Sequence, residues 1–292
     1  MKSPRNKTIA LDEKEGKRYL KRCINAGKDN PVRKYGLSGL TDRTVLGDSL
    51  RLMSMLPEGF ADLVIADPPY NMDKDFNGNR FKKTSDDAYR EYTREWIKKL
   101  LPLLKDTGTV YVCCDWRSSN AVYEVLKKHL IVRNRITWQR EKGRGAKSNW
   151  KNSMEDIWFA TRGGRYTFNT DAVKMRRRVV APYKQDGLPK DWVDDGQGGF
   201  RDTCPSNFWN DISVPFWSMA ENTAHPTQKS EKLLAKRDSV GAGALEEVCA
   251  AALSVTDSPS YKAISTLIRN RGRKRGPDEG GNGEDYAIRR FK

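Results

Sequence analysis

Short apolar runs alternate with amphipathic stretches between residues 44 and 139. The amphipathic stretches 86–104 and 118–130 space their apolar positions at helical intervals and predict two helices. The apolar runs, which predict buried strands, are ADLVIAD (61–67), TVYVCC (109–114) and VRNRITWQ (132–139). Because strands and helices alternate, this part of the chain predicts an α/β fold with a largely parallel sheet.

The rest of the chain is less regular. Residues 1–40 are polar and basic, with one expected helix at 11–26. After residue 140 the pattern predicts long loops interrupted by one strand at 157–163 (IWFATRG), and loops of that length normally carry function or disorder. The predicted divisions are a basic extension (1–40), an α/β part (41–139), a loop-rich region (140–215), a short segment (216–236) and an atypical helical and disordered tail (237–292).

Positive charge changes this picture, because the 292-residue chain carries a net charge of +16. Between residues 133 and 190 there are 15 Lys and Arg against 5 Asp and Glu, which gives +10 in that stretch alone. A basic stretch interleaved with aromatic residues suits phosphate contacts and base stacking, so we expect a nucleic-acid partner. A merely solvated basic surface is the alternative, and we expect Trp138, Trp158 and Phe159 to lie in the core.

Other sites are disfavoured by composition. No apolar run is long enough to span a membrane, and the first residues lack the apolar segment of a secretory signal. The five cysteines therefore predict reduced thiols in a cytoplasmic protein, with Cys113 and Cys114 on opposite faces of one strand. With two histidines and no CxxC pair, no metal site is expected.

The apolar run 61–66 leads directly into Asp67, Pro68, Pro69 and Tyr70. This DPPY sequence resembles the catalytic motif of the amino-group DNA methyltransferases, which transfer a methyl group from S-adenosylmethionine to adenine N6 or cytosine N4. The resemblance implies that the Asp67 carboxylate and the Pro68 carbonyl accept the two N–H groups of the target amine. The prolines would fix that carbonyl, and Tyr70 would stack on the extruded base. A purely structural turn is the alternative.

Further segments resemble the same family in the same order. Gly47 and Asp48 precede DPPY, and HPTQK (225–229) follows the basic region, which is the motif order of the β subgroup. The family usually has proline where this chain has Ser230. The resemblance implies a three-layer methyltransferase sandwich and these cofactor contacts: Asp48, Asp67, His225, Pro226, Thr227 and Gln228. The implied DNA contacts are Arg140, Lys142, Arg144, Lys147, Trp150, Lys151, Arg176, Arg177 and Arg178.

The sequence departs from this family after HPTQK. We find no strand followed by a glycine-rich turn resembling DPFxGSG, which in the β subgroup holds the methionine half of the cofactor. The nearest candidate is residues 238–243, whose glycines are spaced differently and follow no apolar strand. The tail instead resembles the carboxy-terminal end of insertion-sequence transposases. We therefore expect an incomplete cofactor half and weak binding of S-adenosylmethionine.

The leading interpretation is an adenine-N6 methyltransferase of restriction-modification type that acts on double-stranded DNA, because the motif begins with Asp67. The alternatives are a catalytically inactive DNA-binding remnant and a cytosine-N4 methyltransferase. A homodimer is left open, and neither a membrane nor a metal is expected as a partner.

Overall fold

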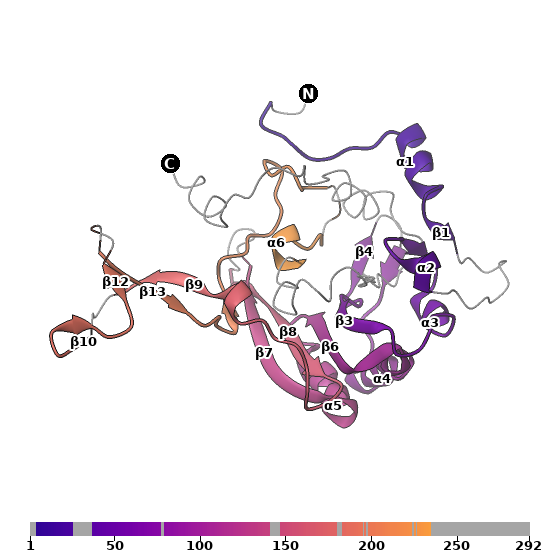
Figure 1. The fold of residues 1–292 in the computed structure, drawn as a ribbon. Helices are drawn as coiled ribbons and strands as arrows, with labels where there is room; N and C mark the ends of the chain where they lie inside the picture. The colour runs from indigo at the N-terminus through magenta and orange to yellow at the C-terminus, as the bar shows by residue number, and fades with distance from the viewer. Residues whose placement is uncertain are drawn as a thin grey trace.

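The computed structural model describes residues 4–25, 37–76, 79–140, 147–179, 183–194, 196, 198–223, 225 and 227–234. Figure 1 shows a central sheet that carries helices against one face and a long arm extending away from it. The expected α/β class is therefore confirmed. The predicted tail (237–292) lies outside the described residues.

The central sheet has five strands in the order β14-β7-β8-β6-β3. These strands are β3 (Ala61–Ala66), β6 (Leu104–Cys114), β7 (Ile131–Gln139), β8 (Met154–Thr161) and β14 (Phe208–Trp209). The expected strands at 61–67, 109–114, 132–139 and 157–163 are all present, and β6 begins five residues earlier than the apolar run TVYVCC. Within the described part of the chain, β3 pairs with β6 alone.

The sheet is mixed, although four of its five strands, β3, β6, β7 and β14, run in the same direction, as expected for a largely parallel sheet. β3 runs parallel to β6 and β14 runs parallel to β7, but β8 lies between β6 and β7 and is antiparallel to both. The alternation of strands and helices gave no strand order, and the later strand β8 lies between β6 and β7. The antiparallel direction of β8 brings its first residues to the edge where β3, β6 and β7 end.

Two helices cover one face of this sheet, α4 (Asp86–Leu100) and α5 (Ser119–His129). α4 begins at Ser85, whose hydroxyl accepts the Ala88 N–H, and it ends in a short 3₁₀ turn, η1 (Leu101–Leu103). The buried side chains between helices and sheet are led by Ile97, Leu100, Val110, Val112, Val122 and Leu126. This apolar layer is the main core, and it fixes where β3 ends.

A second apolar cluster lies on the other face of the sheet. Trp138 is fully buried there, and its indole N–H donates to the Ile212 carbonyl at 2.8 Å. Cys113 belongs to this cluster while Cys114 belongs to the main core, so the prediction of two opposite faces is confirmed. Phe159 is also buried and Trp158 packs against the main core, so the expected core role of these aromatic residues is confirmed too.

The amino-terminal elements pack against this body. They are α1 (Glu13–Leu20), β1 (Ile24–Asn25), α2 (Leu37–Leu40), β2 (Val45–Leu46) and α3 (Ser49–Met53). α1 is shorter than the helix expected at 11–26, because it starts at an Asp12–Glu15 capping box. One contact was not expected. Ile9 forms a parallel bridge with Thr223 and so brings together residues near the two ends of the described chain.

The region 140–215 contains more strands than predicted. Its elements are η2 (Asp171–Val173), β9 (Met175–Arg178), β10 (Lys184–Gln185), β11 (Leu188–Pro189), β12 (Val193–Asp194) and β13 (Gly199–Thr203). β9 and β12 flank β13 in an antiparallel sheet, which forms the projecting arm in Figure 1. We expected long loops here because the strands of the arm are polar and basic. Strands that project into solvent do not show the alternation of apolar and polar residues that identifies a strand in a sequence. No helix among the described residues is long and apolar enough to cross a membrane.

The remaining elements lie near the edge where β3 ends. A hairpin of β4 (Lys74–Phe76) and β5 (Asn79–Phe81) follows the DPPY turn. The last described helix is α6 (Glu231–Leu234), which directly follows HPTQK.

Candidate active site

The DPPY turn is held from the helical face of the sheet. Pro68 is buried, and the buried Tyr89 of α4 donates its hydroxyl to the Pro69 carbonyl at 3.0 Å. This contact fixes the backbone that leads into Tyr70. Asp67, by contrast, keeps a partly open side chain with 38% of its surface exposed. The turn therefore presents a carboxylate from a rigid backbone.

Asn71 fixes the residues that follow. Its side-chain amide bonds the backbone of Thr84 in both directions, accepting the N–H at 2.8 Å and donating to the carbonyl at 3.0 Å. Its own backbone N–H donates to the Ser118 hydroxyl at 3.1 Å. Because Ser118 precedes α5 and Thr84 precedes α4, both helices restrain the end of the turn.

The HPTQK segment folds into a compact loop around Gln228. The Gln228 amide oxygen accepts the Thr223 N–H at 2.7 Å, and its NH₂ group donates to the Glu221 carbonyl at 2.7 Å. The His225 Nδ1 atom lies 3.4 Å from the Thr227 backbone nitrogen. Gln228 thus shapes the loop, and the loop orients the next residue, Lys229.

Lys229 joins the two sequence motifs. Its ammonium group lies 3.1 Å from Asp67 Oδ1 and 5.1 Å from the centre of the Tyr70 ring. Only 12% of the Lys229 side chain is exposed. DPPY and HPTQK therefore form one site at the end of β3.

Glu155 is a member of this site that sequence reasoning missed. It lies near the start of β8, only 3% exposed, and β8 is the antiparallel strand that begins at this edge. Its Oε2 atom lies 3.3 Å from the Tyr70 hydroxyl and 3.4 Å from the Lys229 ammonium group. Its Oε1 atom accepts from the Arg140 guanidinium group. An acid at the start of an apolar strand was the available signal, but its place depends on the direction of β8.

The charges of the site balance, since Asp67 and Glu155 face Arg140 and Lys229. Buried charges are tolerated when they are paired and hydrogen-bonded in this way. The Tyr70 hydroxyl also lies 3.1 Å from Asp67 Oδ1, so it can donate to either carboxylate. The Tyr70 ring is thereby fixed beside the Asp67 carboxylate.

Burial shifts the ionisation of the surrounding groups. It raises the pKa of Tyr70 well above its ordinary value, and the negative charge of Asp67 adds to the effect. It lowers the pKa of His225, with Asp67 opposing and Lys229 adding to the shift. It raises the pKa of Cys113 to about 12, so this thiol stays protonated. Neutral Tyr70 and neutral His225 consequently frame the charged centre.

The predicted cofactor residues fall into separate places. His225 and Thr227 are in the loop beside Asp67, while Gln228 already uses both ends of its amide within that loop. Asp48 caps α3, where its carboxylate accepts the Arg51 N–H at 2.9 Å. Pro226 lies outside the described residues, as does the glycine-containing stretch 238–243. The described residues therefore supply only part of a nucleotide-sized cofactor site.

The residues predicted to contact DNA also lie in different parts of the structure. Arg140 is half-buried in the site, where it binds Glu155 and lies over the Trp138 ring. Trp150 is 96% exposed, and the three consecutive arginines lie on β9 in the projecting arm. Lys147 and Lys151 flank Trp150 on the surface, and Lys142 and Arg144 lie outside the described residues.

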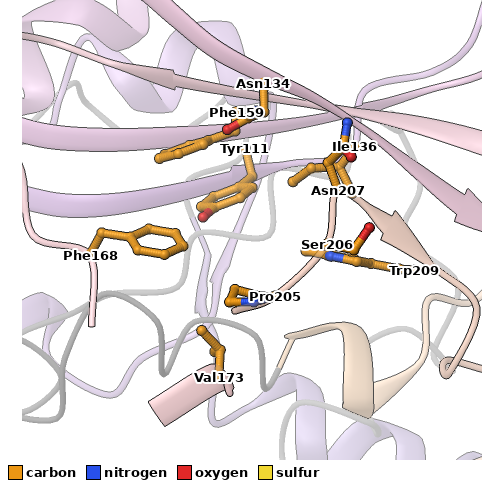
Figure 2. Close-up of a pocket in the computed structure, with 10 residues that line it drawn as sticks. All are labelled: Tyr111, Asn134, Ile136, Phe159, Phe168, Val173, Pro205, Ser206, Asn207 and Trp209. Carbon is orange, nitrogen blue, oxygen red and sulfur yellow. The ribbon is translucent and has the colours of Figure 1, made fainter. Parts of the chain in front are cut away.

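A pocket of about 330 Å³ lies on the sheet face that carries the second apolar cluster (Figure 2). Tyr111 and Phe159 form its floor, and Phe168 and Trp209 border it. No residue of DPPY or HPTQK lines it. Among the described residues, no three His, Cys, Asp or Glu side chains gather as a metal site.

Comparison with known proteins supports the family resemblance that the DPPY and HPTQK motifs indicate. A model of the DNA methylase family N6_N4_Mtase matches residues 61–237, which is more than half of the chain. The Type II methyltransferase M.HpaI of Haemophilus parainfluenzae is 26% identical over 197 residues, covering 66% of this chain and 58% of M.HpaI. The DNA adenine methyltransferase YhdJ of Escherichia coli (strain K12) is 28% identical over 195 residues, covering 64% of this chain and 63% of YhdJ. This chain thus spans less than two thirds of the length of either relative.

Among solved structures, the PvuII DNA methyltransferase (cytosine-N4-specific) has a TM-score of 0.54 at 14% identity. The similarity covers 82% of this chain and 89% of that one, and it supports a shared methyltransferase fold. The family match spans both DPPY and HPTQK, the two motifs that the structure joins through Asp67 and Lys229. This chain therefore belongs to the family of N6-adenine and N4-cytosine DNA methylases.

Proposed function

We propose that this protein methylates adenine N6 in double-stranded DNA as the modification enzyme of a restriction-modification system. The observation that carries the proposal is the placement of the Asp67 carboxylate beside the Tyr70 ring at the end of β3. The names of the relatives support it, since M.HpaI is a Type II methyltransferase and YhdJ is a DNA adenine methyltransferase.

The site residues suit a poor nucleophile. An exocyclic amine shares its lone pair with the ring, so accepting its hydrogens favours a more nucleophilic nitrogen. Asp67 would accept one N–H and the Pro68 carbonyl the other, while Tyr70 stacks on the extruded base. Because Tyr89 holds the Pro69 carbonyl, the adjoining Pro68 carbonyl cannot easily turn away. The proton lost by the amine after transfer would pass to Asp67 or directly to solvent.

S-adenosylmethionine, the family's cofactor, would supply the methyl group. His225 and Thr227, in the loop that brings Lys229 to Asp67, would contact its methionine end. Burial favours neutral His225, so this residue would not repel the positively charged sulfonium group.

DNA would contact the face from which the arm projects. Arg176, Arg177 and Arg178 on β9 would bind phosphates, and exposed Trp150 would stack on a base or pack against a sugar. Residues 201–203 of β13 pair with β9 and not with β12, and a two-stranded ribbon of this kind fits the major groove.

Transfer of a labelled methyl group from the cofactor to mixed-sequence DNA, followed by identification of the modified base, tests this function. We expect N6-methyladenine from the wild-type protein and a loss of at least about a hundredfold in Asp67→Asn. Binding of DNA should persist in that variant, because Asp67 makes no phosphate contact. N4-methylcytosine as the product would overturn the choice of base.

The second candidate is a DNA-binding remnant without catalysis. The unmatched sequence after HPTQK favours it, together with the use of Gln228 within its own loop. In that case DNA binding would fall steeply with salt and no label would be transferred.

A further inference from the structure

The Lys229 ammonium group makes the two contacts that a target amine would need. It donates to Asp67 Oδ1 at 3.1 Å, and it lies over the Tyr70 ring at 5.1 Å from the ring centre. An extruded base would have to place its amine against that same oxygen and its ring against that same face. Lys229 and the base therefore compete for one location.

Glu155 offers Lys229 a second position. Its Oε2 atom is already 3.4 Å from the ammonium group, so a small movement transfers Lys229 from one carboxylate to the other. Glu155 is 4% exposed at its side chain whereas Asp67 is 38% exposed. An incoming base can thus reach Asp67, while Glu155 stays covered and keeps the lysine.

We propose that Lys229 is a positioning residue that fills the target-base position in the free protein, and that Glu155 receives its ammonium group when a base carrying an exocyclic amine binds. This inference rests on the proposed function, since it takes Asp67 as the acceptor for that amine. It assigns roles to two residues that do not themselves exchange atoms with the substrate.

The arrangement makes base capture selective. A base without an exocyclic amine gives Asp67 no donor in return for Lys229, so displacing the lysine would leave the carboxylate with the Tyr70 hydroxyl but without its charged partner. An amine-bearing base replaces the lost N–H contact with its own. Lys229 should therefore lower the affinity for every extruded base, and only an amine-bearing base recovers the lost contact to Asp67 before any chemistry occurs.

The test measures how much the exocyclic amine of the base contributes to DNA binding when no cofactor is present. Short labelled duplexes carry either adenine or purine, which lacks the amine, opposite an abasic position, because an unpaired base is more easily extruded. Fluorescence anisotropy gives the ratio of the two dissociation constants for each variant. Lys232→Met is the matched control for Lys229→Met, since Lys232 forms an exposed ion pair with Asp211. Glu124→Gln, which loosens the surface pair with Arg90, is the control for Glu155→Gln.

We expect the wild-type protein to prefer adenine, and Lys229→Met to raise that preference about threefold to tenfold because nothing is displaced. Glu155→Gln should bring the ratio of the purine and adenine dissociation constants close to one, because Asp67 becomes the only carboxylate partner of Lys229. The double variant should regain at least the wild-type preference. A merely structural role for Glu155 predicts no such rescue, and both control variants should match the wild type.

An unchanged preference in Lys229→Met, with the preference lost in Asp67→Asn, would overturn the role of Lys229 and leave the proposed function standing. Equal binding of adenine and purine by the wild type and by every variant would overturn base capture by Asp67, and with it the proposed function. If Glu155→Gln fails to fold by circular dichroism, the comparison of Lys229→Met with Lys232→Met decides.

Discussion

Tyr70 combines two tasks that a single substitution can separate. Its ring faces the position now taken by Lys229, and its hydroxyl lies within 3.1 Å of Asp67 and 3.3 Å of Glu155. Burial raises the pKa of the phenol, so it remains a neutral donor up to and beyond pH 10 and adds no charge to the site. The ring would serve the base, while the hydroxyl orients the ring.

Replacing Tyr70 with phenylalanine and with alanine distinguishes these tasks. Tyr70→Ala should weaken binding of the adenine duplex by about tenfold, because stacking of a base on an aromatic side chain contributes roughly 1–3 kcal/mol. Tyr70→Phe keeps the ring and should lose no more than about threefold, which corresponds to one modest hydrogen bond. Anisotropy titrations measure both, and equal losses in the two variants would show that the ring is not the contact.

At the scale of single elements, α4 holds the catalytic turn. Tyr89 and Tyr92 lie one turn apart on this helix, and both hydroxyl groups are shielded from solvent. The Tyr89 hydroxyl donates to the Pro69 carbonyl, whereas the Tyr92 hydroxyl finds no hydrogen-bond partner among the residues that the structure describes. The same helix therefore contains a tyrosine that fixes the turn and a matched tyrosine that does not.

Tyr89→Phe should lower the free energy of unfolding by about 1–2 kcal/mol, because it leaves the Pro69 carbonyl without its donor. It should also slow methyl transfer, since the backbone before Tyr70 loses its restraint. Tyr92→Phe removes a buried hydroxyl group that bonds nothing, so its stability should equal or exceed that of the wild type. Urea unfolding of both variants checks this, and equal destabilisation would refute the role of the Tyr89 contact.

At the scale of the whole molecule, β3 is an edge strand of the sheet that the structure describes. β3 carries the catalytic turn and pairs with β6, and no other described strand lies beside it. The sequence after HPTQK contains no match to the glycine-rich cofactor turn of the β subgroup. An apolar strand with one free edge also invites association with another chain.

We therefore predict that the isolated chain binds S-adenosylmethionine weakly. Titration calorimetry on the purified protein should show a dissociation constant above about 1 mM, which corresponds to less than about 4 kcal/mol of binding free energy. DNA binding measured on the same sample should remain strong at low salt, which serves as the control for folded protein. Tight cofactor binding would contradict this prediction.

Local patterns identified β3, α4, β6, α5 and β7 without help from the structure. Each has its own apolar periodicity over enough residues to be recognised. The arm escaped recognition because short polar strands that pair only with each other carry little periodic signal. The strands of the arm and the antiparallel insertion of β8 were missed for related reasons, since pairing partners are not encoded in a local window.

The sequence by itself determined the turn that ends β3, because Asp67, Pro68, Pro69 and Tyr70 directly follow an apolar run that local periodicity identifies as a strand. Only the tertiary structure decided which groups surround that acid. The insertion of β8 between β6 and β7 brings Glu155 to the carboxyl edge, and the fold of the Gln228 loop brings Lys229 onto Asp67. Both placements depend on strand direction and on contacts between residues far apart in the chain, which no local pattern specifies.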